Sequence, residues 1–221
     1  MTAVHDLSAS ELSGAYARGE LSPVEATRAV LEHMDRWEPR INAMYLVHRD
    51  AALAAAAESE ARWRAGNPLS AIDGVPVTIK ENLYTKGDPA PLGTLVTDPS
   101  PRPHDAPPSA RMREAGCVIL GKTTMPDFGM LSSGRSSKHG TTRNPWRLDR
   151  NPGGSSSGAG AAAAAGYGPL HIGTDIGGSV RLPAAVCGLF GLKPSLGRIP
   201  IDPPYMGRAA GPMTRSVADA A

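Results

Sequence analysis

The strongest constraint on this chain is a segment in its second half that is built largely from small residues. Gly153–Gly166 reads G-G-S-S-S-G-A-G-A-A-A-A-A-G, and Gly173–Ala185 reads G-T-D-I-G-G-S-V-R-L-P-A-A. Glycine permits positive φ angles and the close approach of another chain or a ligand. The paired glycines before Ser179 would leave consecutive backbone N–H groups free to bind an anion. We therefore expect serine hydroxyls at sharp turns, with Ser179 beside an anion-binding loop.

These runs resemble the signature of the amidase signature family, whose members are serine hydrolases with a Ser–cis-Ser–Lys triad. The family pattern, G-G-S-S-[SG]-G followed by G-T-D-x-G-G-S-[IV]-R-x-P-[AS]-A, matches Gly153–Gly158 and Gly173–Ala185. The family's upstream lysine motif, G-[IV]-P-x-x-[IV]-K-[DE]-N, is matched by Gly74–Asn82. Two further landmarks are matched by Gly121–Phe128 and Thr142–Trp146, and all motifs occur in the family's order. The resemblance extends from the first expected helices to the last residue.

The resemblance implies a role for each matched residue. Ser179 would attack the substrate carbonyl and form an acyl-enzyme, Ser155 would be the cis-serine that relays the proton, and Lys80 would be the final base. The backbone N–H groups of four consecutive residues would form the oxyanion hole: Ile176, Gly177, Gly178 and Ser179. Four further side chains would support this network: Ser157, Thr174, Asp175 and Arg181. Ser132 is expected in a loop that contributes to substrate binding.

A lysine base must be uncharged near neutral pH. The pKa of a free lysine is about 10.4, so burial must lower the pKa of Lys80 by roughly three units. The apolar run Val75–Ile79, which leads into Lys80, favours such burial.

Two other motif matches suggest different chemistry but fail in their context. Gly116–Thr123 fits the phosphate-loop pattern G-x-x-x-x-G-K-[ST], yet its central residues form an expected strand instead of the loop that should follow one. Gly154–Gly158 fits G-x-S-x-G of the α/β-hydrolases, in which an acid and then a histidine follow the serine. The last histidine is His171, and no Asp or Glu lies between Ser156 and it.

Apolar runs alternate with helical patterns along the chain, which predicts an α/β fold. The resemblance adds a mixed β-sheet core surrounded by helices, truncated relative to the family. Helices are expected over 6–20, from 22 onward, over 50–66, 105–115, 125–131 and 157–166, and from 211 to the end; strands are expected over 74–80, 117–120, 170–174 and 189–192. Residues 1–66 are expected to be a helical segment that packs on the core, and residues 67–221 the N-terminal half of the catalytic domain.

Composition limits the expected partners and location. A net charge of +2 provides no basic stripe, so nucleic acid is not an expected direct partner. Cys117 and Cys187 are expected to be buried free thiols in a reducing cytoplasm. No signal peptide is evident, and Ala161–Ala165 is too short to span a membrane. We therefore expect a cytoplasmic protein, and the resemblance implies catalysis without a metal or cofactor.

The resemblance implies hydrolysis of a small-molecule carboxamide to an acid and ammonia or an amine. One alternative within the same fold is the A subunit of a tRNA-dependent amidotransferase, in which the same triad releases ammonia from glutamine for a partner subunit. Another is a catalytically incomplete fragment that acts only as an interaction module. Family members are considerably longer, so one expected partner is a second chain that supplies the missing half. A homo-oligomer is the other expected assembly.

Overall fold

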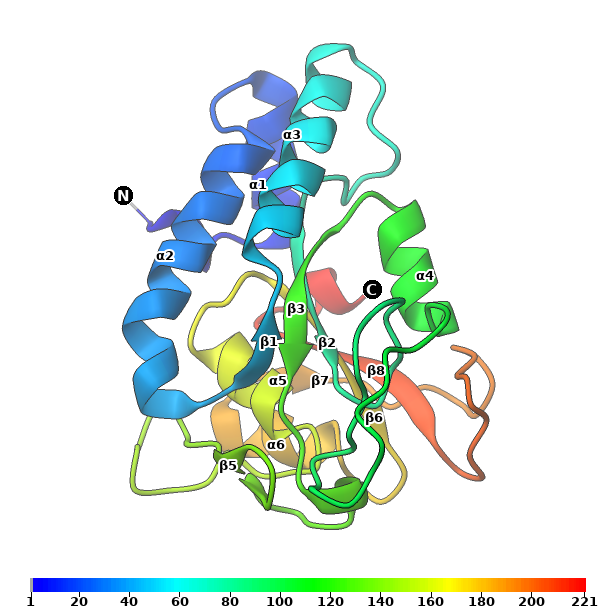
Figure 1. Ribbon diagram of the computed structural model, residues 1–221. Coiled ribbons are helices and arrows are strands. Elements are labelled where there is room, and N and C mark those ends of the chain that lie inside the picture. Colours follow the sequence, from blue (N-terminus) through cyan, green and yellow to red (C-terminus); the bar gives the residue numbers. More distant parts are fainter. Residues whose placement is uncertain (1) are drawn as a thin grey trace.

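A six-stranded mixed sheet forms the centre of the computed structural model, which describes residues 2–221 (Figure 1). Its strands are β1 (Met44–Val47), β2 (Pro76–Lys80), β3 (Val118–Thr123), β6 (Leu170–Asp175), β7 (Phe190–Gly191) and β8 (Ala209–Thr214), in the spatial order β1-β3-β2-β6-β8-β7. The central strand β2 is parallel to both β3 and β6, whereas the other pairs are antiparallel. Every residue of β2 and β3 is buried, as expected for strands covered on both faces.

Helices cover this sheet. They are α1 (Ala9–Arg18), α2 (Pro23–Ile41), α3 (Arg49–Arg64), α4 (Pro107–Glu114), α5 (Ser157–Ala164) and α6 (Arg181–Cys187), with short 3-10 turns η1 (Val4–Asp6), η2 (Asp127–Gly129) and η3 (Ala218–Ala220). α2 and α3 lie side by side (Figure 1). A separate hairpin is formed by β4 (Arg135–Ser136) and β5 (Gly140–Thr141). The mixed sheet with surrounding helices confirms the expected fold class.

Local sequence signals explain where the first two helices begin. Ser8 and Glu11 form a reciprocal capping box at the start of α1, and Ser22 and Glu25 do the same for α2, where Pro23 occupies the first turn. These side chains satisfy backbone N–H groups that a helix leaves without partners at its N-terminus. The start expected at residue 22 is therefore confirmed, whereas the helix expected from residue 6 begins only at Ala9, after the 3-10 turn η1.

Two expected helices are wrong, and one strand of the sheet was not expected. The segment from Gly211, expected to be a helix, belongs instead to strand β8, because Gly211 and Pro212 pair with Gly173 and Ile172 of β6. β1 was not expected in the N-terminal segment, yet it pairs with β3 at the edge of the sheet. The expected helix over residues 125–131 is only the three-residue turn η2. In each case, pairing or packing with distant residues overrides the local pattern.

The register of β2 and β6 determines where the polar side chains meet. Ile79 pairs with Ile172, so the next residues of both strands, Lys80 and Gly173–Asp175, lie together at the carboxyl ends of these strands. α5 starts beside these strand ends, and its small residues allow the helix to approach the sheet closely. A Cβ atom at Gly158 would lie 2.3 Å from the carbonyl oxygen of Ala43. The carboxyl ends of parallel strands are the usual position of sites in α/β proteins.

Candidate active site

Lys80, the last residue of β2, lies at the centre of a cluster of hydroxyl groups. Its side chain is fully buried, as the preceding apolar run suggested. The Nζ atom lies 2.9 Å from the Oγ of Ser155, 2.9 Å from the Oγ of Ser156 and 3.0 Å from the Oγ1 of Thr174. The Gly154–Ser155 peptide bond is cis. The structure thus brings together Lys80, Ser155 and Thr174 from three separate parts of the sequence.

The surroundings of Lys80 favour the uncharged amine. Burial lowers the pKa of Lys80 well below its usual value, and the positive charge of Arg208 lowers this pKa further. The negative charges of Glu81 and Asp175 act in the opposite direction but are outweighed. A fully buried ammonium group is costly because it loses its hydration, so the amine releases its proton more easily.

Two of the three hydroxyl partners are fixed by further hydrogen bonds. The Ser156 Oγ accepts from the backbone N–H of Thr174 at 3.2 Å and donates to the carbonyl oxygen of Thr174 at 3.1 Å. The Thr174 Oγ1 accepts from the Asn82 Nδ2 at 3.1 Å. Within residues 2–221, the Ser155 hydroxyl has no hydrogen-bond partner other than Lys80. Ser155 is therefore the least constrained of the three.

The loop that carries Ser179 is organised around the carboxylate of Asp175. This carboxylate accepts from the backbone N–H groups of Gly178 at 2.8 Å and Val180 at 3.0 Å. It also accepts from the Arg181 guanidinium at 3.0 and 2.9 Å. Burial alone would raise the pKa of Asp175, but these hydrogen bonds, led by those from Arg181, lower it well below its usual value. Asp175 and Arg181 thus form an ion pair that shapes the loop.

The N–H groups expected to bind an oxyanion differ in their contacts. Gly178 already donates to Asp175, whereas Ile176, Gly177 and Ser179 have no acceptor for their backbone N–H among residues 2–221. The Ser179 hydroxyl likewise makes no hydrogen bond within this part of the chain, so the structure does not join it directly to Ser155. The two serine loops are linked by the Ser156 N–H, which donates to the carbonyl oxygen of Ser179 at 3.2 Å.

A cavity of about 250 Å³ lies over this cluster and contains both Ser155 and Ser179. Its lining combines the polar residues of the site with apolar side chains on the rim. The lining residues are Asn82, Phe128, Gly129, Met130, Leu131, Ser132, Ser155, Thr174, Ile176, Gly177, Ser179, Leu182, Tyr205 and Arg208. Ser132 is thus in the cavity wall, where substrate binding was expected. Ser157 does not line the cavity, and its buried hydroxyl has no hydrogen-bond partner within residues 2–221.

Three residues of the site had no role expected from the sequence: Asn82, Ser156 and Arg208. Asn82 closes the quoted lysine motif, so its nearness to Lys80 was a usable signal. Ser156 was considered only as the serine of an α/β-hydrolase motif, but its hydroxyl is fully buried and bonded to Thr174. Arg208 carries no local signal, because it reaches the site only through the pairing of β8 with β6.

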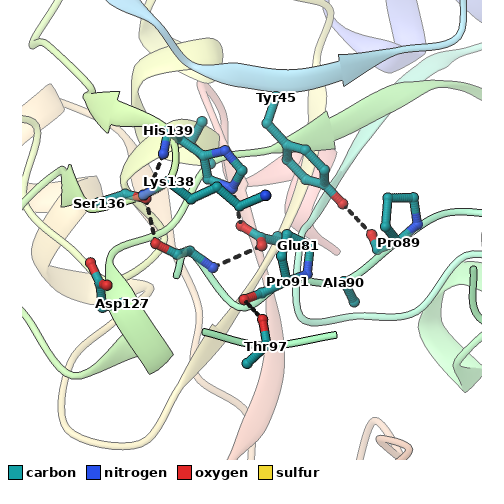
Figure 2. A network of polar contacts seen from close by, with 12 residues as sticks. Tyr45, Glu81, Pro89, Ala90, Pro91, Thr97, Asp127, Ser136, Lys138 and His139 are labelled. Carbon is teal, nitrogen blue, oxygen red and sulfur yellow. Dashed lines mark hydrogen bonds and ion pairs between the residues drawn. The ribbon is translucent and has the colours of Figure 1, made fainter. Parts of the chain in front are cut away.

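A second polar network supports the site from the side of Glu81, the residue after Lys80 (Figure 2). The buried Glu81 carboxylate accepts from the Gly93 N–H at 2.8 Å and contacts the His139 Nε2 at 3.0 Å. The Tyr45 ring stacks on the His139 ring, with centroids 4.7 Å apart. The Ser136 Oγ donates to the carbonyl oxygen of Gly93 at 2.5 Å. The network therefore fixes the loop around Gly93 and the β4–β5 hairpin to the end of β2.

The phosphate-loop match is rejected by the structure. Residues 118–123 of this match form strand β3, and Lys122 is fully buried. Its Nζ donates to the carbonyl oxygen of Leu83 and is not presented to a ligand. The expected free thiols Cys117 and Cys187 are both buried and unpaired.

No group of three or more His, Cys, Asp and Glu side chains in residues 2–221 is arranged to hold a metal ion. Of the helices in this range, none has both the length and the apolar character needed to cross a membrane.

Comparison with known proteins identifies relatives over the whole length of this chain. The A subunit of glutamyl-tRNA(Gln) amidotransferase from Thermobifida fusca is 45% identical over 231 residues, covering 100% of this chain and 45% of that protein. Its counterpart from Salinispora tropica is 43% identical, covering 100% of this chain and 46% of that protein. The chain thus spans about half the length of these relatives.

Solved structures show the same relationship. A bacterial aryl acylamidase of the amidase signature family superposes with a TM-score of 0.93 at 33% identity, covering 100% of this chain and 47% of that chain. The peptide amidase of Stenotrophomonas maltophilia superposes with a TM-score of 0.90 at 36% identity, covering 98% of this chain and 46% of that chain. The sequence model of the family described as Amidase matches residues 25–221. The chain therefore belongs to the amidase signature family.

Proposed function

We propose that this chain carries the acylation machinery of an amidohydrolase, in which Ser179 is the nucleophile, Ser155 the proton relay and Lys80 the base. The observation that carries the proposal is the fully buried Lys80 amine, which lies within 3.0 Å of three hydroxyl oxygens. Burial supplies the low pKa that a base needs, and the hydroxyls supply a route for the proton.

The hydrogen bonds around Lys80 favour one direction of proton transfer. A neutral amine donates two hydrogen bonds and accepts one through its lone pair. The Ser156 hydroxyl already donates to the Thr174 carbonyl, so Ser156 must accept from Lys80. Thr174 can serve as the second acceptor. The lone pair is then left for the Ser155 hydroxyl, which has no other partner among residues 2–221. Ser155 can thus pass its proton to Lys80.

The proposed reaction follows from this arrangement. The Ser179 Oγ attacks the carbonyl carbon of the amide while its proton passes to the Ser155 Oγ, and the Ser155 proton passes to the Lys80 Nζ. The backbone N–H groups of Ile176, Gly177 and Ser179, together with Gly178 if its bond to Asp175 is exchanged, stabilise the oxyanion. The proton then returns to the leaving nitrogen, the C–N bond breaks, and water hydrolyses the acyl-enzyme.

The test uses the complete gene product, because the chain spans about half the length of its relatives. Ser179→Ala and Lys80→Ala should each lower kcat for ammonia release at least about 10³-fold, since nucleophile and base act as one unit. A fluorophosphonate probe should label Ser179, and mass spectrometry should locate the adduct. Ser100→Ala, a change of an exposed serine, is the control and should keep normal labelling. Near-normal turnover by Lys80→Ala would contradict the proposed base.

A second candidate is favoured by the names of the relatives. Proteins 43–45% identical to this chain are named as the A subunit of glutamyl-tRNA(Gln) amidotransferase, which would make glutamine the amide and a second chain the partner. Ammonia release from L-glutamine that rises when a co-purifying partner is present would support this candidate. Efficient hydrolysis of simple amides without any partner would favour an independent amidohydrolase.

A further inference from the structure

Of residues 2–221, Arg208 is the one cationic residue that lines the proposed active-site cavity. It immediately precedes β8, whose first residue Ala209 pairs with Asp175 of β6. The antiparallel register therefore places Arg208 beside Ile176, the first residue of the loop that carries Ser179. The Arg208 side chain lines the same cavity as Ser155 and Ser179.

The charge of Arg208 is not balanced by the residues that the structure describes. The guanidinium carbon lies 4.2 Å from the centre of the Tyr205 ring, and no carboxylate of residues 2–221 lies within ion-pair distance. The other residues that line the cavity are all uncharged. By contrast, the partly exposed Arg62 is paired with Asp73 at 2.7 Å. A half-buried cation without a counter-ion creates a favourable position for an anion.

We propose that Arg208 binds a carboxylate of the substrate, so that the preferred amides are those that also carry a carboxylate, such as monoamides of dicarboxylic acids. The inference rests on the proposed amidohydrolase function. The Tyr205 ring lies beside the guanidinium carbon, at 4.2 Å from ring centre to carbon, and a guanidinium can form two parallel hydrogen bonds with a carboxylate. The uncharged, partly apolar walls strengthen such an ion pair relative to one in water.

Matched substrates separate this role from general support of catalysis. Glutaramate and pentanamide have the same chain length but differ in the terminal carboxylate, and succinamate and butanamide form a second pair. In the complete gene product, kcat/KM should be at least tenfold higher for the carboxylate member of each pair. Arg208→Met should lower this ratio at least tenfold, and Arg208→Lys should restore part of it. Arg198→Met, a change of an exposed arginine outside the cavity, is the control and should leave the ratio unchanged.

An arginine that only stabilised the oxyanion or the neutral Lys80 would change both members of a pair equally. An unchanged ratio in Arg208→Met would therefore overturn the inference even if both rates fell. Binding provides a readout that does not depend on turnover. In Ser179→Ala protein, calorimetry should show glutarate binding that weakens at least tenfold when Arg208→Met is added. Equal glutarate binding with and without Arg208 would also overturn the inference. If the complete protein hydrolysed none of the amides but still bound glutarate through Arg208, only the proposed hydrolysis would be contradicted.

Discussion

Two lysines are fully buried at the ends of neighbouring strands, and their partners give them different tasks. Lys80 of β2 contacts three hydroxyl groups, whereas Lys122 of β3 donates to the carbonyl oxygen of Leu83. A hydroxyl can both accept and donate a proton, but a carbonyl oxygen can only accept a hydrogen bond. Lys122 can therefore hold the chain after β2 in place, while the geometry for proton exchange exists only at Lys80.

The cost of burying Lys122 should appear in the pH dependence of stability. Burial lowers the pKa of Lys122 to about 7, although the negative charges of Asp88, Glu81 and Asp105 act to raise it. In the unfolded chain this pKa is near 10.5. Between pH 10 and pH 7 the unfolded chain binds a proton at this lysine and the folded chain does not. The free energy of unfolding should therefore fall with decreasing pH, by on the order of 1 kcal/mol per pH unit, and level off below pH 7.

Urea unfolding at pH 7, 8, 9 and 10 would measure this effect, with Lys122→Met for comparison. As the pH falls, the free energy of unfolding of Lys122→Met should rise relative to that of the wild type. Lys138→Met, a change of an exposed lysine, is the control and should show no such trend. Parallel pH profiles for wild type and Lys122→Met would show that the folded protein keeps Lys122 charged.

The residues of the candidate site were predictable to different degrees. Lys80 and Ser155 lie in motifs with fixed spacing, and the structure brings them into contact. The contact of Ser179 with this pair was also expected but remains a prediction, because its hydroxyl is not bonded to theirs. Arg208 could not be found from the sequence, since its place depends on a strand pairing that the local pattern did not reveal.

At the scale of elements, small residues determine how closely α5 approaches the sheet. The Gly158 N–H donates to the carbonyl oxygen of Thr124 at 3.1 Å, and the helix packs its first turn against the ends of β1 and β3. The helix itself was predictable from its alanine-rich sequence, but this packing was not. For β8 the element type itself was not predictable from the local sequence. Its G-P-M-T sequence resembles a helix start, and only pairing with β6 makes it a strand.

Gly158→Ala should reveal how tight this packing is. The new Cβ would lie 2.3 Å from the Ala43 carbonyl oxygen and 2.4 Å from the Thr124 backbone nitrogen, so α5 must move away from the sheet. Although alanine favours a helix by about 1 kcal/mol, overpacking against fixed backbone should lower the free energy of unfolding by at least about 2 kcal/mol.

The matched control for this prediction is Gly14→Ala in α1. There the new Cβ would approach only the flexible end of Arg18, at 3.1 Å, so the helix preference should dominate and raise stability by about 0.5–1 kcal/mol. Denaturant unfolding would compare the two variants. If both substitutions stabilised the protein, the close approach of α5 to the sheet would be wrong.

At the scale of the whole molecule, the two ends of the chain are joined through one arginine. The Arg215 guanidinium donates to the carbonyl oxygens of His5 and Leu7 in the N-terminal segment, at 3.3 Å each. It also donates to the carbonyl oxygen of Ala163 at the end of α5, at 3.3 Å, and to that of Gly168 in the turn before β6, at 3.0 Å. The Ala9 N–H adds a bond of 2.9 Å to Asp219. The N-terminal segment is thus held against the end of α5 and the turn that leads into β6.

Arg215→Met should therefore destabilise more than one region. Four partly buried carbonyl groups would lose a charged donor, and each loss of a buried partner is costly, so the free energy of unfolding should fall by more than about 2 kcal/mol. Arg215→Lys should recover little of this stability, because one ammonium cannot reproduce the planar fork that reaches carbonyls on both sides.

Hydrogen exchange of Arg215→Met should be faster both at residues 4–9 and at residues 163–168. Arg18→Met, which breaks only the exposed pair with Glu20, is the control and should cost less than about 1 kcal/mol. Faster exchange confined to residues 4–9 would mean that Arg215 secures the N-terminal segment without linking it to the end of α5.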